Sequence, residues 1–157
     1  MHDGNQNVAP EEVDAIARIV HRLLDGDAMW TDREGKTKKL ATDDILVVAP
    51  YNAQVWDLSE RLRGIRVGTV DKFQGREAPV VIYSLTTSSP EEAPRGMEFL
   101  YSLNRLNVAT SRARSTVILV GCPMLFEPDC RSPRQMQLAN AFCRYLELAA
   151  IIDVAAV

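Results

Sequence analysis

Apolar residues recur along this chain at two spacings, and each spacing predicts a different kind of element. Between Pro10 and Gly26 they come at steps of three and four, the period of one helix face: Val13, Ile16, Ala17, Val20, Leu23 and Leu24. A proline near the start, acidic residues in the first turn and a glycine after the last apolar position are typical of helix ends. This stretch therefore predicts an amphipathic helix.

Short runs of branched apolar residues predict buried parallel strands, because such strands are covered on both faces. The runs span residues 45–49, 67–70, 80–85 and 116–120. Helical periodicity lies between them, over residues 52–63, about 103–113 and about 133–149. The alternation predicts an α/β fold with a mostly parallel sheet, helices on both faces and ligands beyond the carboxyl ends of the strands.

Polar stretches interrupt this alternation. Within residues 27–44, a turn at Glu34-Gly35-Lys36 is expected to join two short ribbon strands, and the prolines and small polar residues of 86–96 predict a loop. With 157 residues, 46% of them hydrophobic, the chain can bury one core but not two. We therefore expect one domain over residues 10–150, a polar N-terminal segment over 1–9 and a C-terminal tail over 151–157.

The charge balance excludes a global attraction to nucleic acid. The formal net charge is -3 and the pI is about 5.4, so any contact with DNA or RNA must be local. The chain has neither a signal-peptide pattern nor an apolar stretch of about 18 residues. A soluble, cytoplasmic protein with no membrane contact is the expectation.

Cysteine and histidine spacing predicts no metal site. Cys122, Cys130 and Cys143 are odd in number and form no Cys-x-x-Cys pair, which argues against disulfides and zinc and favours buried, reduced thiols. His2 and His21 also lack metal-ligand spacing. We expect His2 on a frayed start and His21 on a helix surface.

Gly35-Lys36-Thr37 looks like the end of a phosphate-binding loop (Walker A), but the surrounding sequence excludes this. The motif needs a glycine five residues before Gly35, where Trp30 stands, and no buried strand precedes it. A complete nucleoside triphosphatase needs that loop and a Mg²⁺-holding acid (Walker B). The isolated chain is therefore not expected to be an enzyme by itself.

Two polar segments carry candidate chemistry. Residues 67–77 form a polar turn between two predicted strands, which is equally compatible with a functional loop and with a well-capped connector. In residues 103–114, Arg105 and Arg112 are seven apart and would share one helix face, with Arg114 turned about 200° from Arg112. The arginine pair would face a neighbour or an anion, or form a solvated charged face.

Taken in order, three segments resemble motifs IV, V and VI of superfamily 1 helicases. They are Ala49 to Gln54, Thr69 to Glu77 and Leu106 to Arg114. The chain looks most like the branch of the nonsense-mediated-decay helicase and the replication helicase-nuclease, and within it like bacterial fusions of a RecB-type nuclease to a helicase. The resemblance, which covers about Asn5 to Ala149, implies a three-layer RecA-like fold of the P-loop NTPase class: the second, C-terminal lobe of a helicase, with ATP between the lobes.

The resemblance also implies nucleotide-binding residues. Arg112 matches the catalytic motif VI arginine, which reaches the γ-phosphate and stabilises the charge on the transferred phosphoryl group. Glu77 matches the motif V acid that binds the ribose, and Gly75 the backbone that approaches the phosphates. Gln74 is implied to couple the nucleotide cleft to the strand-binding face.

Positions beside the backbone of a bound strand are implied in the same way, where contacts hold phosphates without reading sequence. They are Pro50, Tyr51, Thr69 and Asp71. Arg105 is implied to orient motif VI or the loop beside it. Ala49 departs from the family's threonine, so one hydroxyl contact is lost, whereas Thr110-Ser111 in place of Leu-Thr keeps a hydroxyl at 111.

These matches predict the second motor domain of an ATP-dependent DNA or RNA helicase. It would use ATP with Mg²⁺ held mainly by the first RecA-like lobe of the same polypeptide, bind single-stranded nucleic acid and move 5′ to 3′. A fused RecB-type nuclease domain is a further partner that the resemblance allows. The alternative is a non-catalytic RecA-like module that docks nucleic acid or protein. The retention of both Glu77 and Arg112 counts against that alternative, and the choice between DNA and RNA stays open.

Overall fold

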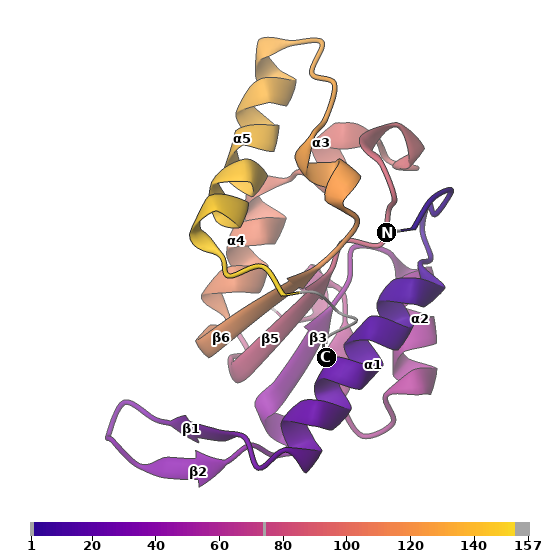
Figure 1. Ribbon diagram of the computed structural model, residues 1–157. Helices are drawn as coiled ribbons and strands as arrows, with labels where there is room; N and C mark the ends of the chain where they lie inside the picture. Colours follow the sequence, from indigo (N-terminus) through magenta and orange to yellow (C-terminus); the bar gives the residue numbers. More distant parts are fainter. Residues whose placement is uncertain (1, 74, 153–157) are drawn as a thin grey trace.

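A four-stranded parallel sheet forms the centre of the computed structural model, which describes residues 2–73 and 75–152 (Figure 1). The spatial order of the strands is β4-β3-β5-β6, and every neighbouring pair is parallel. The strands are β3 (Ile45–Val48), β4 (Arg66–Gly68), β5 (Ala78–Ser84) and β6 (Ala113–Val120). The predicted α/β class is confirmed.

The period of two along the central strands divides the core into two halves. Ile45, Val47 and Ile82 belong to one buried cluster, which includes apolar residues of α1 (Pro10–Asp25) and α2 (Asn52–Arg61). Val81 and Tyr83 belong to a second cluster, on the opposite face of the sheet. Because β3 and β5 are buried along their whole length, both faces must be covered by other elements.

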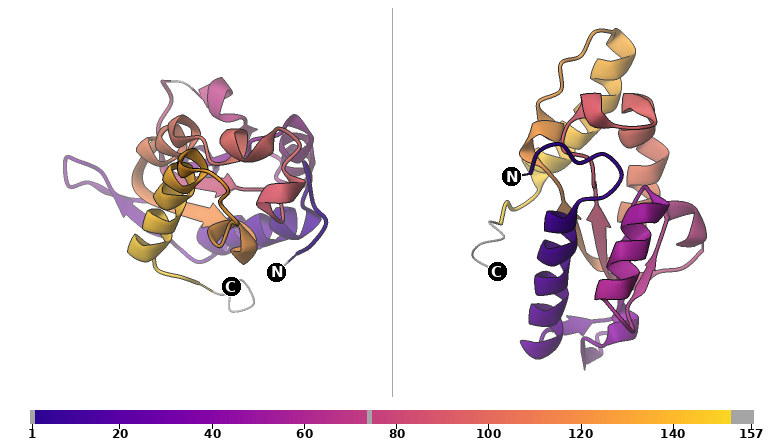
Figure 2. Two further views of the ribbon diagram at one scale, coloured as in Figure 1. Left: turned by 90° about the horizontal axis from the view of Figure 1, so that it is seen from above. Right: turned by 90° about the vertical axis from the view of Figure 1, so that its right-hand side faces the viewer.

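Helices provide this cover in two layers (Figures 1 and 2). Helices α1 and α2 pack on one face, and the second cluster joins the other face to α3 (Gly96–Leu100), α4 (Leu103–Ser111) and α5 (Pro133–Leu148). The three layers agree with a RecA-like fold. No helix in the described ranges is long and apolar enough to cross a membrane.

The predicted ribbon is present as an antiparallel hairpin, β1 (Met29–Thr31) with β2 (Thr37–Lys39), which extends away from the sheet (Figure 1). Gly35 has φ +80°, a conformation that glycine adopts without strain. The other short elements are 3₁₀ turns at Thr42–Asp44, Val70–Phe73, Pro90–Glu92 and Pro123–Phe126. Cys122 is buried, Cys130 and Cys143 are partly exposed, and all three are free thiols.

Three sequence predictions need correction. The helix predicted to reach residue 113 ends at Ser111, because Ala113 already pairs with Ala78 as the first residue of β6. The predicted loop after β5 leads directly into α3, a short helix that its composition did not indicate. His2 is not frayed: it is 8% exposed, whereas His21 lies on the exposed helix surface as expected.

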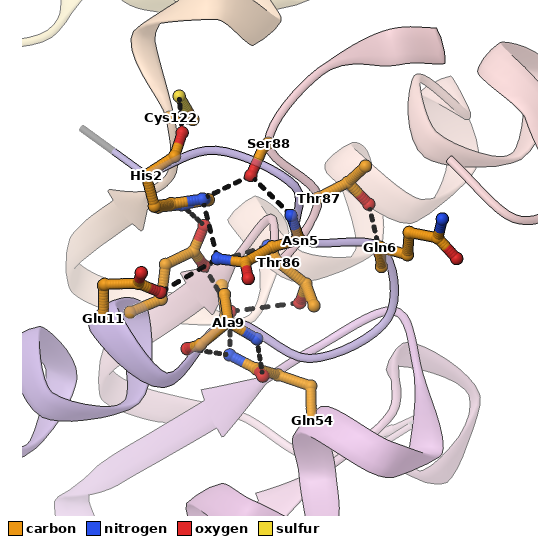
Figure 3. Close-up of polar contacts among 12 residues, drawn as sticks. His2, Asn5, Gln6, Ala9, Glu11, Gln54, Thr86, Thr87, Ser88 and Cys122 are labelled. Atoms are coloured by element: carbon orange, nitrogen blue, oxygen red, sulfur yellow. Dashed lines mark hydrogen bonds and ion pairs between the residues drawn. The ribbon is translucent and has the colours of Figure 1, made fainter. Parts of the chain in front are cut away.

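Residues 2–9 of the N-terminal segment form no helix or strand, but a polar network binds them to the region around the carboxyl end of β5 (Figure 3). His2 contacts Ser88 at 2.7 Å and Glu12 at 3.0 Å, and the backbone amide of Ala9 donates to Gln54 at 2.8 Å. The polar residues of this segment are thus partners for buried polar groups, which need hydrogen bonds inside a protein.

Candidate functional site

The implied site residues divide between the two ends of the parallel sheet. Pro50 and Tyr51 follow the carboxyl end of β3, and Thr69 follows that of β4. Glu77 and Arg112 directly precede β5 and β6, whose first residues, Ala78 and Ala113, are paired. The implied nucleotide residues therefore lie at the amino ends of their strands, and not at the carboxyl ends where the general rule for such sheets would place a ligand.

Arg112 occupies the turn between α4 and β6. Its backbone is still helical, with φ -82° and ψ -16°, and its carbonyl accepts from the Ala78 amide at 3.0 Å. The side chain is partly exposed, yet its Nε is buried and has no hydrogen-bond partner in the described part of the chain. A buried guanidinium N–H without an acceptor is costly, and an anion that accepted from it would remove this cost.

Glu77 already has a cationic partner. Its Oε2 accepts from Nε of Arg114 at 3.0 Å, and the side chains are 44% and 50% exposed. Arg114 lies in β6 and not in a helix, so local sequence patterns did not indicate this pair of residues, which are 37 positions apart. The parallel register that joins Ala78 to Ala113 brings them together.

Gly75 leaves open space at the same end of the sheet. Its φ is +81°, and a Cβ added there would meet nothing within 4 Å. A ligand could therefore approach this backbone closely, as the implied phosphate contact requires. Gln74, the implied coupling residue, lies outside the described residues.

The implied strand-binding residues are less accessible than their motifs suggest. Pro50 and Tyr51 are buried, Thr69 is partly exposed and Asp71 is exposed in the 3₁₀ turn after β4. The amide of Ala49 donates to the carbonyl of Gly68 at 3.2 Å, which joins the ends of β3 and β4. Through backbone and turn groups, this edge could hold a phosphate chain.

The aromatic side chain of Tyr51 is packed against residues that the motifs did not include. Its ring centroid is 5.5 Å from that of Phe99. Burial raises the pKa of the Tyr51 phenol, and the Thr87 hydroxyl and the nearby guanidiniums of Arg95 and Arg105 partly oppose this rise. Tyr51 is thus neutral at physiological pH and lies beside two cations.

Arg105, one member of the predicted arginine pair, already has partners within the domain. Its NH2 lies 3.7 Å from the Asp71 carboxylate, and its guanidinium lies over the ring of Phe99, 4.2 Å from the centroid. Asp71, implied to contact a nucleic acid, is therefore the ionic partner of Arg105.

Within residues 2–73 and 75–152, no three His, Cys, Asp or Glu side chains gather in a way that could hold a metal ion. The amino-end residues Glu77, Arg112 and Arg114 suit an anionic or hydroxyl-bearing ligand.

Comparison with known proteins places this arrangement in a family. Residues 1–124 match the family described as "AAA domain". The chain belongs to this AAA domain family. Relatives of the AAA domain include the putative helicase mov-10-B.1 of Danio rerio, 30% identical over 134 residues, or 75% of this chain and 13% of that protein. The probable helicase MAGATAMA 3 of Arabidopsis thaliana is 28% identical over 147 residues, or 82% and 16%.

A third relative, the DNA replication ATP-dependent helicase/nuclease DNA2 of Gallus gallus, is 38% identical over 84 residues, half of this chain and 8% of that protein. The AAA domain thus corresponds to less than a fifth of the length of these relatives. Because the matched relatives carry helicase names, this AAA domain is a helicase-family domain of superfamily 1.

Proposed function

We propose that this AAA domain is the second motor domain of an ATP-dependent helicase. In this proposal Arg112 completes an ATP site whose phosphate cradle and Mg²⁺ ligands belong to a first RecA-like lobe. The carboxyl ends of β3 and β4 hold the backbone of a single strand. The single observation that carries the proposal is the buried Nε of Arg112, which has no acceptor among the described residues. Arg112 and Glu77 directly precede the paired residues Ala113 and Ala78.

The chemistry at the amino ends follows from the charges there. ATP bound with Mg²⁺ would supply the γ-phosphoryl group that is transferred to water. The delocalised guanidinium of Arg112 is suited to hold the charge that spreads over three phosphoryl oxygens. It would be positioned by the end of α4 and by the hydrogen bond from Ala78 to its carbonyl.

Glu77 and Gly75 would hold the rest of the nucleotide. The Glu77 carboxylate can accept from ribose hydroxyls while one oxygen stays paired with Arg114, since a carboxylate has about four lone-pair sites. The open backbone at Gly75 would lie beside the phosphates. Gln74 would connect this group to the strand-binding face.

At the other end of the sheet, the strand would lie over the loops after β3 and β4. Pro50, Tyr51, Thr69 and Asp71 form this edge. Their contacts would be to phosphate and sugar, which fits movement along any sequence. Closure of the lobes on ATP and their reopening after hydrolysis would move the strand, 5′ to 3′ by the branch that the motifs resemble.

The test is Arg112→Ala in the full-length protein that contains this domain. We expect kcat for ATP hydrolysis to fall by about a thousandfold or more, as for other arginines that stabilise phosphoryl transfer, with single-strand affinity largely unchanged. Arg134→Ala, at an exposed position of α5, is the matched charge control and should keep wild-type turnover. Normal turnover in Arg112→Ala would contradict the motor assignment and favour a docking module.

A further inference from the structure

Two guanidiniums lie over one aromatic ring at the carboxyl side of the sheet. The Cζ of Arg95 is 4.5 Å from the centroid of Phe99, and the Cζ of Arg105 is 4.2 Å from it. We call Arg95, Phe99 and Arg105 the guanidinium stack. Arg95 and Phe99 come from the segment after β5, which none of the helicase motifs includes.

The two cations of the stack differ in how their charge is balanced. Arg105 is 21% exposed and lies 3.7 Å from the Asp71 carboxylate. Arg95 is exposed, and no carboxylate of the described chain lies within ion-pair distance of it, although Glu91, Glu92 and Glu98 are close in sequence. Arg95 is therefore a cation that is held in place but not neutralised.

Stacking prepares the Arg95 guanidinium for an anion. A guanidinium lying over an aromatic ring loses some of its freedom while its N–H edges stay available for hydrogen bonds. Phosphate oxygens match that edge with two parallel hydrogen bonds. Part of the side-chain entropy that Arg95 would lose on binding a ligand is thus already lost in the free domain.

The stack is continuous with the proposed strand-binding edge. The ring of Phe99 is 5.5 Å from that of Tyr51, and Arg105 forms an ion pair with Asp71 in the turn after β4. A groove of about 290 Å³ lies beside Arg105. Its lining is Val70, Asp71, Ser102, Asn104, Arg105 and Val108.

We propose that Arg95 binds a backbone phosphate of the single strand, so that the strand-binding surface continues from the ends of β3 and β4 onto α3. This inference rests on the strand binding assigned under the proposed function. It supplies the local cation that a chain of net charge -3 needs for contact with nucleic acid. A phosphate contact of this kind is independent of base sequence.

The test is a titration of the chain with fluorescein-labelled oligothymidylate, followed by fluorescence anisotropy over a series of KCl concentrations. Loss of one phosphate contact in Arg95→Ala should reduce the magnitude of the slope of log K against log [KCl] by about 0.7. Affinity at low salt should fall about tenfold. Arg95→Lys should keep the slope and lose part of the affinity, because lysine preserves the charge but not the stacked fork.

Arg18→Ala, on the exposed side of α1, removes the same charge far from the stack in the chain and should leave the slope unchanged. A circular dichroism melt checks that each variant folds. If wild type binds and Arg95→Ala keeps its slope, or if Arg18→Ala reduces it equally, the inference on Arg95 is overturned and the proposed function stands. If wild type does not bind at any salt concentration, strand binding by this domain is overturned, and this inference with it.

Discussion

Glu12 shows how much a single buried residue can organise at the end of a strand. It is 2% exposed on α1, and its carboxylate accepts from the Thr86 amide at 2.9 Å, from the Ser84 hydroxyl and from the His2 ring. Thr86 has φ +71°, which a β-branched residue rarely adopts. Glu12 therefore helps to hold a strained backbone turn directly after β5.

Removal of this carboxylate should destabilise the fold. Glu12→Ala leaves His2, Ser84 and the Thr86 amide without their acceptor, and we expect the free energy of unfolding to fall by about 3 kcal/mol. Urea unfolding followed by circular dichroism measures this. Glu11→Ala, at the exposed neighbouring position, should change it by less than about 0.5 kcal/mol. Equal losses in both variants would show that the network has no special role.

At the same scale, the motif resemblance implied roles for Arg112 and Glu77 but did not predict which residues surround them. Both residues could be singled out from the order and spacing of residue types in the motifs, which are local properties of the sequence. Arg114 as the partner of Glu77 depends on the register of two strands, which local sequence does not encode. Arg95 and Phe99 were missed because their segment, rich in proline and small polar residues, predicts only a loop.

Among the elements, strands and long helices were predictable, and their ends were not. The runs of branched residues predicted β3 and β5 because these strands are buried on both faces. The end of α4 was misplaced by two residues, since the pairing of Ala113 with Ala78 ends the helix where periodicity alone would continue it. A short helix such as α3 carries too few turns to show a period.

The hairpin turn depends on one carboxylate and should respond to acid. Asp32 accepts from the Lys36 amide at 2.9 Å and from Lys38 Nζ at 3.1 Å, and these hydrogen bonds lower the pKa of its carboxyl. Because the folded pKa is depressed, the contribution of Asp32 is complete above the ordinary aspartate range. It is lost as the pH falls through the folded pKa.

The Lys36 amide chemical shift, measured by NMR against pH, should therefore report a midpoint below that of an ordinary aspartate. In Asp32→Asn, which cannot ionise, the titration should disappear while the turn is kept, because the amide oxygen still accepts. A midpoint at or above the ordinary value would mean that the carboxylate does not hold the turn in solution.

For the whole molecule, the net charge and the proposed division of the ATP site between two lobes set the expected behaviour of the isolated chain. With a net charge of -3, it should bind single strands weakly, and binding should weaken further with salt. It should also hydrolyse no ATP, because the proposal assigns the phosphate cradle and Mg²⁺ ligands to another lobe. Phosphate release and anisotropy assays on the purified chain measure both. Tight, salt-resistant binding would contradict the weak binding expected from the charge, and measurable turnover would contradict the proposal that this domain supplies only part of an ATP site.

The length of β5 has a mechanical consequence. Its seven residues separate Glu77 at one end from the Glu12-bound turn at the other, a span of about 23 Å at the usual rise per residue. Because β5 is buried and hydrogen-bonded to a strand on each side, we expect it to be rigid and to keep its length. Nucleotide and strand would then be kept at a fixed offset within this domain. In a motor that contains this domain, movement along the strand would then come from rotation of whole domains relative to each other, and not from deformation within this domain.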